Sequence, residues 1–86
     1  MEKKYSLTNE KKVVNEHIVY RIIAEKDFDD IKKGTLGGFV ESEKNLSHND
    51  NCWIHNNATV FDNATVCGNA IIYGNAIVCD NVIVYG

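Results

Sequence analysis

Three histidines are the residues of this chain whose chemistry best suits catalysis near neutral pH: His17, His48 and His55. A neutral imidazole can accept a proton from a substrate, which is the role of a general base. His55 lies close to Trp53 at a position that should point outward, so it could act as a general base at a subunit boundary. A solvated surface histidine is the simpler interpretation and the one we favour. We therefore predict no catalytic residue.

The three cysteines, Cys52, Cys67 and Cys79, are candidates for a disulfide or a metal site. Their number is odd, their spacings are wide, and no Cys-x-x-Cys pair occurs. These features fit neither a disulfide framework nor a zinc site. The sequence therefore predicts free thiols in a reducing compartment and no bound metal.

Paired carboxylates occur at Asp29–Asp30 and at Glu41 and Glu43. Acid–base chemistry requires such groups to converge in a cleft, and nothing in the sequence brings these together, so we interpret them as solvated. Asp62 and Asp80 occupy equivalent positions of a repeat described below and would stack as like charges. They could form a weak cation site, although exposed carboxylates are the simpler interpretation. No cofactor is predicted.

Charge is distributed unevenly along the 86 residues, whose net charge is −3. All nine Lys and Arg lie at or before Lys44, and from Asn45 onward only three aspartates are charged. Nucleic-acid binding needs a cationic surface, so the second half is not expected to bind nucleic acid. No apolar run is long enough to cross a bilayer, and the N-terminus does not have the pattern of a signal peptide. We expect a soluble, cytoplasmic protein without a membrane partner.

A six-residue repeat dominates the second half. From Ile54 the chain repeats an aliphatic residue, a variable one, Gly, Asp or Asn, then Asn, then a small apolar residue, five times in succession. Strand side chains alternate between two faces, and Gly and Asn tolerate the left-handed backbone of a corner. Three such sides close one triangular turn, so side chains separated by three repeats should stack. The expected inward residues are Ile54, Val60, Val66, Ile72, Val78, Val82 and Val84.

This pattern resembles the hexapeptide-repeat family, whose fold is the left-handed parallel β-helix, and residues 52–86 carry the resemblance. It implies a mainly β protein with about two regular coils within residues 45–86. Residues 1–44 would form an N-terminal β-hairpin-like cap and an irregular first coil, in one compact unit with the repeats. Many proteins of this family are acyltransferases that use a histidine at a trimer interface and bind coenzyme A. They are typically longer than this chain, so we expect no enzyme here.

A second, narrower resemblance extends from Tyr20 to Trp53 and includes Gly34–Val40 (Gly-Thr-Leu-Gly-Gly-Phe-Val). It is to the N-terminal cap of short, uncharacterised hexapeptide-repeat proteins found largely in phages, prophages and bacterial genomes. The resemblance implies a phage or prophage context. It brings no established activity with it.

The N-terminal half has weaker local signals. Residues 17–24 are rich in β-branched and aromatic residues and predict a strand, and residues 3–7 predict a short one. Residues 8–16 suit a loop or hairpin connection, and residues 27–33 a single helical turn. A tight bend is expected at Gly37–Gly38. The irregular first coil is expected to use Leu36, Phe39 and Leu46.

Several outward positions of the repeats are apolar, which favours an interface over a solvated surface. The last coil also has no polar cap before Gly86, and terminal repeats normally need one. We therefore expect a second copy to cover it, most simply in an end-to-end or side-by-side homodimer, with a trimer left open. The predicted interface residues are Trp53, Phe61, Ile71, Tyr73, Ile77, Ile83 and Tyr85.

These features predict a non-enzymatic, protein-binding β-solenoid that acts as an oligomer. The apparent phage kinship makes an inhibitor of a host protein, of the anti-defence or anti-CRISPR kind, the specific role we favour, acting in the host cytoplasm. One alternative is a minimal hexapeptide-repeat acyltransferase. The other is a protein that sequesters a nucleotide signal at a subunit boundary.

Overall fold

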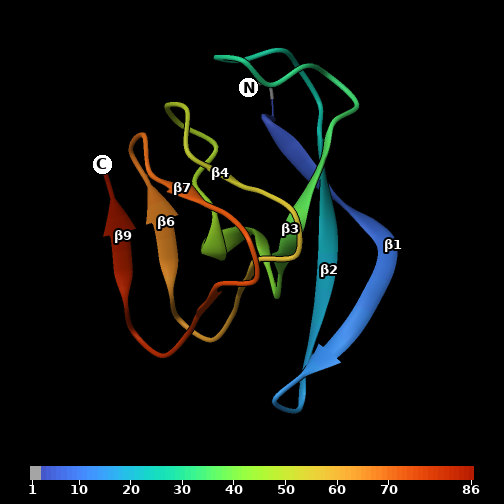
Figure 1. The fold of residues 1–86 in the computed structure, drawn as a ribbon, viewed down its shortest axis with the longest axis vertical. Coiled ribbons are helices and arrows are strands. Elements are labelled where there is room, and N and C mark those ends of the chain that lie inside the picture. The colour runs from blue at the N-terminus through green and yellow to red at the C-terminus, as the bar shows by residue number, and fades with distance from the viewer. Residues whose placement is uncertain (1–2) are drawn as a thin grey trace.

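The computed structural model describes residues 3–86, and over this range the fold is mainly β (Figure 1). A single 3₁₀ turn, η1, interrupts the strands, and no helix in the described range is long and apolar enough to cross a membrane. The elements in chain order are β1 (Tyr5–Val14), β2 (His17–Ala24), β3 (Leu36–Val40), η1 (Glu43–Asn45), β4 (Trp53–Ile54), β5 (Thr59–Val60), β6 (Thr65–Cys67), β7 (Ile71–Ile72), β8 (Ile77–Val78) and β9 (Ile83–Tyr85).

The N-terminal third is a long antiparallel hairpin of β1 and β2. The strand predicted at residues 17–24 is confirmed as β2. The first strand is twice as long as predicted, because residues 8–14, which are polar apart from Val13 and Val14, continue it instead of forming a loop. Asn15 and Glu16 both have positive φ angles, 48° and 69°. That conformation fits a two-residue hairpin turn whose twist matches the strands it joins.

Two further local predictions in this half are wrong. Residues 27–33 form no helical turn; instead Phe28 and Ile31 make an antiparallel bridge, and Asp27 Oδ1 accepts a hydrogen bond from the Lys33 amide at 2.8 Å. Gly37–Gly38 is not a bend but the middle of β3. A Cβ atom at either glycine would lie within 2.6 Å of a carbonyl oxygen, that of Ile54 or Ala58. Glycine is therefore required because another backbone passes so close.

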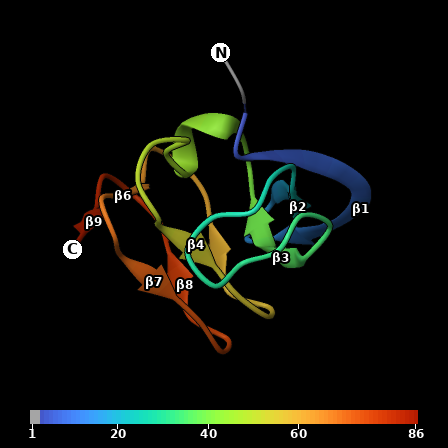
Figure 2. The same cartoon turned by 90° about the horizontal axis from the view of Figure 1, so that it is seen from above.

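The six-residue repeats form three parallel strand pairs, β4–β7, β5–β8 and β6–β9. In every pair the partners are separated by three repeats, as in Trp53 opposite Ile71, so the predicted stacking is confirmed. We call β4, β5 and β6 the inner layer and β7, β8 and β9 the outer layer. Figure 2 shows that β6–β9 and β4–β7 run along different sides of the molecule. Corner residues such as Asp62 and Gly74 have positive φ angles, 60° and 71°, as the repeat predicted.

The N-terminal half is joined to the repeats through one sheet of order β1-β2-β3-β5-β8. Val40 of β3 pairs in parallel with Val60, and Leu46 forms a bridge to Val66. In both cases the partners lie slightly further apart in the sequence than three repeats, so the layer before the repeats is irregular, as expected. Phe39 and Leu46 are buried in it, whereas Leu36 is mostly exposed.

The core is densest where the hairpin meets the inner layer. Among the predicted inward residues, Ile54, Val60, Val66 and Ile72 are buried, Val78 and Val84 are half-buried, and Val82 is exposed. Burial therefore decreases from the inner to the outer layer, because the outer layer has a neighbouring layer on one side only.

Two of the predicted interface residues are not at the surface. Trp53 is fully buried, with edge-on ring contacts to Tyr5 and Phe28, and Phe61 packs in a cluster with Val19. Both side chains point outward from the repeats, toward the face that the N-terminal half covers. The repeat pattern gives the direction of a side chain but not what lies above it, so their predicted exposure is wrong.

Candidate functional site

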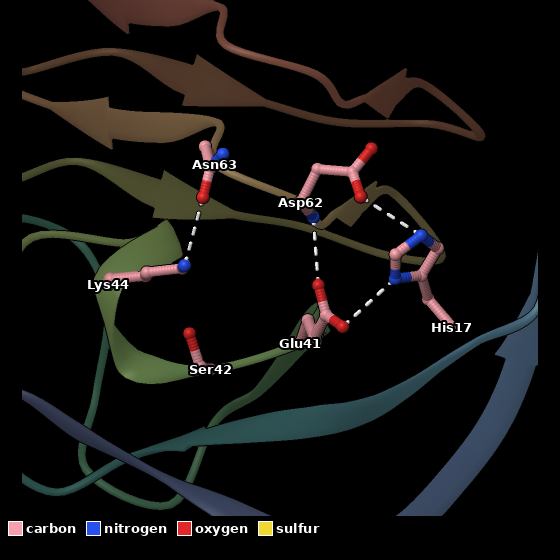
Figure 3. A pocket seen from close by; sticks show the side chains of 6 residues that line it. All are labelled: His17, Glu41, Ser42, Lys44, Asp62 and Asn63. Carbon is pink, nitrogen blue, oxygen red and sulfur yellow. Dashed lines mark hydrogen bonds and ion pairs between the residues drawn. The ribbon is translucent and has the colours of Figure 1, made fainter.

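A pocket of about 410 Å³ lies where three neighbouring strands begin or end (Figure 3). His17 is the first residue of β2, Glu41 follows β3, and Asp62 follows β5. Because β2, β3 and β5 are adjacent in the sheet, these three side chains meet at one place. The pocket is lined by His17, Glu41, Ser42, Lys44, Asp62 and Asn63.

The imidazole of His17 lies between two carboxylates. Its Nδ1 is 2.9 Å from Glu41 Oε2, and its Nε2 is 2.9 Å from Asp62 Oδ1. Neutral imidazole has one donor nitrogen, so both bonds require the doubly protonated, charged ring. The ring also contacts Phe61 at 4.8 Å between centroids, which fixes its orientation.

The pKa values of this group follow from the same contacts. The hydrogen bond to Glu41 raises the pKa of His17, and the negative charge of Asp62 adds to the effect. Conversely, the bond from His17 lowers the pKa of Glu41. A histidine whose two ring nitrogens both face carboxylates is a poor general base, because neither nitrogen is directed at a substrate.

Backbone amides hold the outer oxygens of both carboxylates. Glu41 Oε1 accepts the amide of Asp62 at 2.9 Å, and Asp62 Oδ2 accepts the amide of Asp80 at 3.2 Å. Each carboxylate thus has one oxygen on the backbone and the other on His17. These contacts fix both carboxylates in place.

The opposite side of the pocket is formed by the η1 segment. Lys44 Nζ donates to Asn63 Oδ1 at 3.0 Å, and Figure 3 shows this bond on the side of the pocket opposite His17. The Ser42 hydroxyl oxygen is buried and has no hydrogen-bond partner among residues 3–86. Asn45 holds the segment: its side-chain oxygen accepts the amides of Glu41 and Ser42.

A second group of potential ligands shares Asp62. The carboxylates of Asp62 and Asp80 and the thiol of Cys79 present ligand atoms that all lie within 4.8 Å of one another, and so do those of His17, Glu41 and Asp62. Burial, together with the charges of Asp80 and Asp62, raises the pKa of the Cys79 thiol. All three cysteines are free, as predicted.

The other sequence candidates lie elsewhere. His48 has a structural environment: its ring stacks on Tyr5, its Nδ1 accepts the amide of Lys4, and its Nε2 is 2.8 Å from Glu43. His55 is half-buried and belongs to neither cluster. The remaining interface candidates are all exposed on or beside the outer layer: Ile71, Tyr73, Ile77, Ile83 and Tyr85.

The sequence predicts no functional role for His17, and it indicates that Glu41 is a solvated surface carboxylate. The only signal present was the pair Asp62 and Asp80, which suggested a cation site without the histidine. His17 could be placed next to Asp62 only by knowing that β2 and β5 flank β3.

Comparison with known proteins gives a limited result. No family model matches the chain. Over 45 residues it is 42% identical to a protein of Escherichia coli strain K12 described as the uncharacterized acetyltransferase YdcK. The match covers 51% of this chain and 14% of that protein, so the chain spans a small part of the relative's length.

Proposed function

We propose that this chain is a protein-binding β-solenoid whose outer layer associates with a second copy of the chain. The observation that supports this is that exposed apolar side chains coincide with a backbone edge that pairs with no other strand among residues 3–86. As the finer description of the fold, we propose a short left-handed β-helix. The constant three-repeat register of the parallel strand pairs and the positive φ angles at the corners support it.

The backbone register identifies the unpaired edge. Amides of the inner layer donate to carbonyls of even-numbered outer residues, for example Trp53 to Ala70, Thr59 to Ala76 and Thr65 to Val82. In a parallel ladder, alternate residues direct their N–H and C=O groups to opposite sides. The odd-numbered residues therefore direct theirs away from the inner layer. They include Ile71, Ile77 and Ile83.

The same odd-numbered residues expose large apolar side chains. Ile77, Ile83 and Tyr85 are 57%, 62% and 75% exposed. Natural sheet edges are protected by lysine, proline or inward charges. Beyond residue 69 the chain has no basic residue and no proline, and Asp80 is its only acid. This edge therefore has little protection against pairing.

A second copy is the occupant that fits best. A twofold axis brings the same surface of both copies together, so an unprotected edge meets an unprotected edge. The opposite side of the molecule differs, because edge strand β1 carries Lys11 and Lys12. We therefore expect a dimer formed through the outer layers.

The test is the mass of the full chain in solution at micromolar concentration, by sedimentation or light scattering. We expect about twice 9.7 kDa. Ile77→Lys and Ile83→Lys should yield monomers, because each places a charge in the apolar contact. Val13→Lys is the matched control: Val13 is 69% exposed, but it lies on β1, so this variant should remain a dimer.

Two results would refute the proposal. One is a wild-type chain that stays monomeric at micromolar concentration. The other is a dimer that survives Ile77→Lys and Ile83→Lys but dissociates in Val13→Lys, because this would place the contact on the hairpin.

Acetyl transfer is a second candidate, and the similarity to YdcK is the observation that favours it. His17 is a poor base because both ring nitrogens face carboxylates, which leaves His55 as the residue to test. Calorimetry with acetyl-coenzyme A measures this directly. Saturable binding that is lost in His55→Ala and kept in His17→Asn would support transfer, and absence of binding would exclude it.

The narrower role of a phage-encoded inhibitor of a host protein stays a prediction, as does sequestration of a nucleotide signal. Tyr73 and Tyr85 are the exposed aromatic residues by which a host protein would be contacted. Replacing both with serine should abolish recovery of a host partner from lysate. If the variant recovers the same proteins as wild type, these residues do not form the contact.

A further inference from the structure

We infer that two copies of this chain meet end to end about a twofold axis through Val84, so that β9 of one copy pairs in antiparallel fashion with β9 of the other. The inference rests on the self-association proposed above and adds its geometry: which strands meet, and in which register. Its test is therefore designed to fail separately from that of the dimer itself.

The outer layer is a free end of the molecule. Figures 1 and 2 both show β1 and β9 at opposite ends. The sheet order β1-β2-β3-β5-β8 agrees, with the hairpin at one edge and β8 at the other. The N–H and C=O groups of the odd-numbered outer residues point away from the inner layer, and therefore along the direction in which the layers stack. A second copy that uses these groups is added at this end, and the two hairpins lie at the far ends of the dimer.

A twofold axis across this end makes the contacting strands antiparallel. In the proposed β-helix the three outer strands are successive sides of one coil, so they follow one another around the stack in one sense. Half a turn about an axis perpendicular to the stack reverses that sense. Each strand that meets another across the interface therefore runs opposite to it. One strand, on the axis, meets its own counterpart, and the other two exchange partners.

Strand conformation selects β9 as the strand on the axis. In an antiparallel pair centred on one residue, the neighbours on both sides exchange the hydrogen bonds, so both must be extended. In β9 the residues Ile83, Val84 and Tyr85 all belong to the strand, whereas β7 and β8 are only two residues long. With Val84 on the axis, Ile83 of each copy lies opposite Tyr85 of the other. A β-branched side chain opposite an aromatic one is a favourable cross-strand pair.

Asp80 gives an independent reason against one alternative. It is exposed at the corner between β8 and β9. An axis through β7 would exchange β8 with β9, and this would place the Asp80 corners of the two copies together, where like charges repel. With the axis through β9, the two Asp80 residues lie at different corners. Charge therefore disfavours β7, and strand length distinguishes β9 from β8.

The test uses the fact that only a residue on the axis meets its own counterpart. Val84 would form a non-hydrogen-bonded pair with Cα atoms about 4.5 Å apart, a separation that a disulfide can bridge. The parent chain carries Cys67→Ser and Cys79→Ser and keeps Cys52, which is buried. Adding Val84→Cys should give a covalent dimer on mild oxidation, seen by non-reducing electrophoresis and reversed by a reductant.

Val78→Cys and Ile72→Cys in the same parent are the matched controls, because these residues occupy the equivalent positions of β8 and β7. Neither should form the covalent dimer. Sedimentation of the wild-type chain is measured alongside. If the chain is a dimer but cross-links through residue 78 or 72, or through none of the three, the proposed arrangement is wrong and self-association stands. A monomeric wild type refutes both.

Exchange of charge is a second test that needs no disulfide. Ile83→Lys alone should give a monomer. Adding Tyr85→Asp should restore the dimer, because positions 83 and 85 of the two copies lie opposite each other. Adding Tyr73→Asp instead should leave the chain monomeric, and circular dichroism shows that each variant is folded. Restoration by Tyr73→Asp rather than Tyr85→Asp would place the axis in β8 and overturn the inference.

Discussion

At the scale of single residues, Lys4 shows how a charged side chain can hold the fold together. It is fully buried, and its Nζ donates to the carbonyl oxygens of Cys52 at 2.7 Å and Asp50 at 3.3 Å. Burial lowers the pKa of the ammonium group. Nζ also lies 5.0 Å from the centre of the Phe28 ring. Lys4 thus ties the start of the hairpin to the segment before β4.

Replacing Lys4 with alanine should therefore destabilise the chain. The change removes the donor to the Cys52 carbonyl, and an unpaired buried acceptor costs about 1–3 kcal/mol. Urea unfolding measures this difference in the free energy of unfolding. The control is Lys11→Ala, because Lys11 lies on the exposed part of the same hairpin. Equal stability of the two variants would show that the buried ammonium contributes nothing.

Glu43 provides a pH-dependent contribution of known sign. Hydrogen bonds from His48 and Lys3 lower its pKa in the folded chain below the ordinary value of 4.5. The stabilisation is therefore fully present above that value and is lost as the pH falls through the folded pKa. Glu43→Gln should reduce the unfolding free energy at pH 7 by less than about 1 kcal/mol, since the pairs are largely exposed.

The measurement is thermal unfolding of wild type and Glu43→Gln between neutral and strongly acidic pH. The difference between them should disappear once Glu43 is protonated in the folded state. A difference that stays constant at all pH values would mean that the loss is steric rather than electrostatic. Asp27→Asn, which removes another surface carboxylate, is measured in the same way. Comparing the two variants shows whether the pH dependence of the stability difference is specific to Glu43.

At the scale of elements, β3 depends on the absence of side chains at two positions. A Cβ atom at Gly38 would lie 2.4 Å from the Ala58 carbonyl oxygen, which belongs to the backbone and cannot rotate away. Gly38→Ala should therefore cost about 1–3 kcal/mol or more, as overpacking does. Gly74→Asn is the control: its surroundings are open, and Asn56 occupies the same corner position with a positive φ. Denaturant unfolding of both variants measures the change in the free energy of unfolding. A Gly38→Ala variant that is as stable as wild type would contradict the close approach of the two backbones.

The elements also show what a sequence of this kind can and cannot predict. The repeats were predictable because each strand, each corner and each stacking partner follows from the identity of six positions. The N-terminal half has no such period, so its hairpin length and the course of β3 depended on contacts with distant residues. Trp53 and His17 show the consequence. Trp53 was expected at the surface and is covered by the hairpin. His17 meets its two carboxylate partners only because of the order of the strands in the sheet.

At the scale of the whole molecule, burial is greatest where the hairpin meets the inner layer and least at the outer layer. Tyr5, Trp53 and Leu46 are completely buried between the N-terminal half and the inner layer, while most large apolar side chains of the outer layer are exposed. A layer supported on one side should open more readily than one supported on both. The stability of the outer layer should therefore depend on whatever covers it.

Hydrogen exchange can separate these layers and test the dimer at the same time. The amide groups of Ile71, Ile77 and Ile83 face away from the inner layer, so they should exchange rapidly in a monomer, whereas those of Ile72 and Val78 should be protected. Raising the protein concentration should slow exchange at the odd-numbered positions, because dimerisation would pair them. Ile83→Lys should abolish this concentration dependence while leaving protection in β2 unchanged. If the odd-numbered amides exchange rapidly at every concentration, another chain does not pair with this edge.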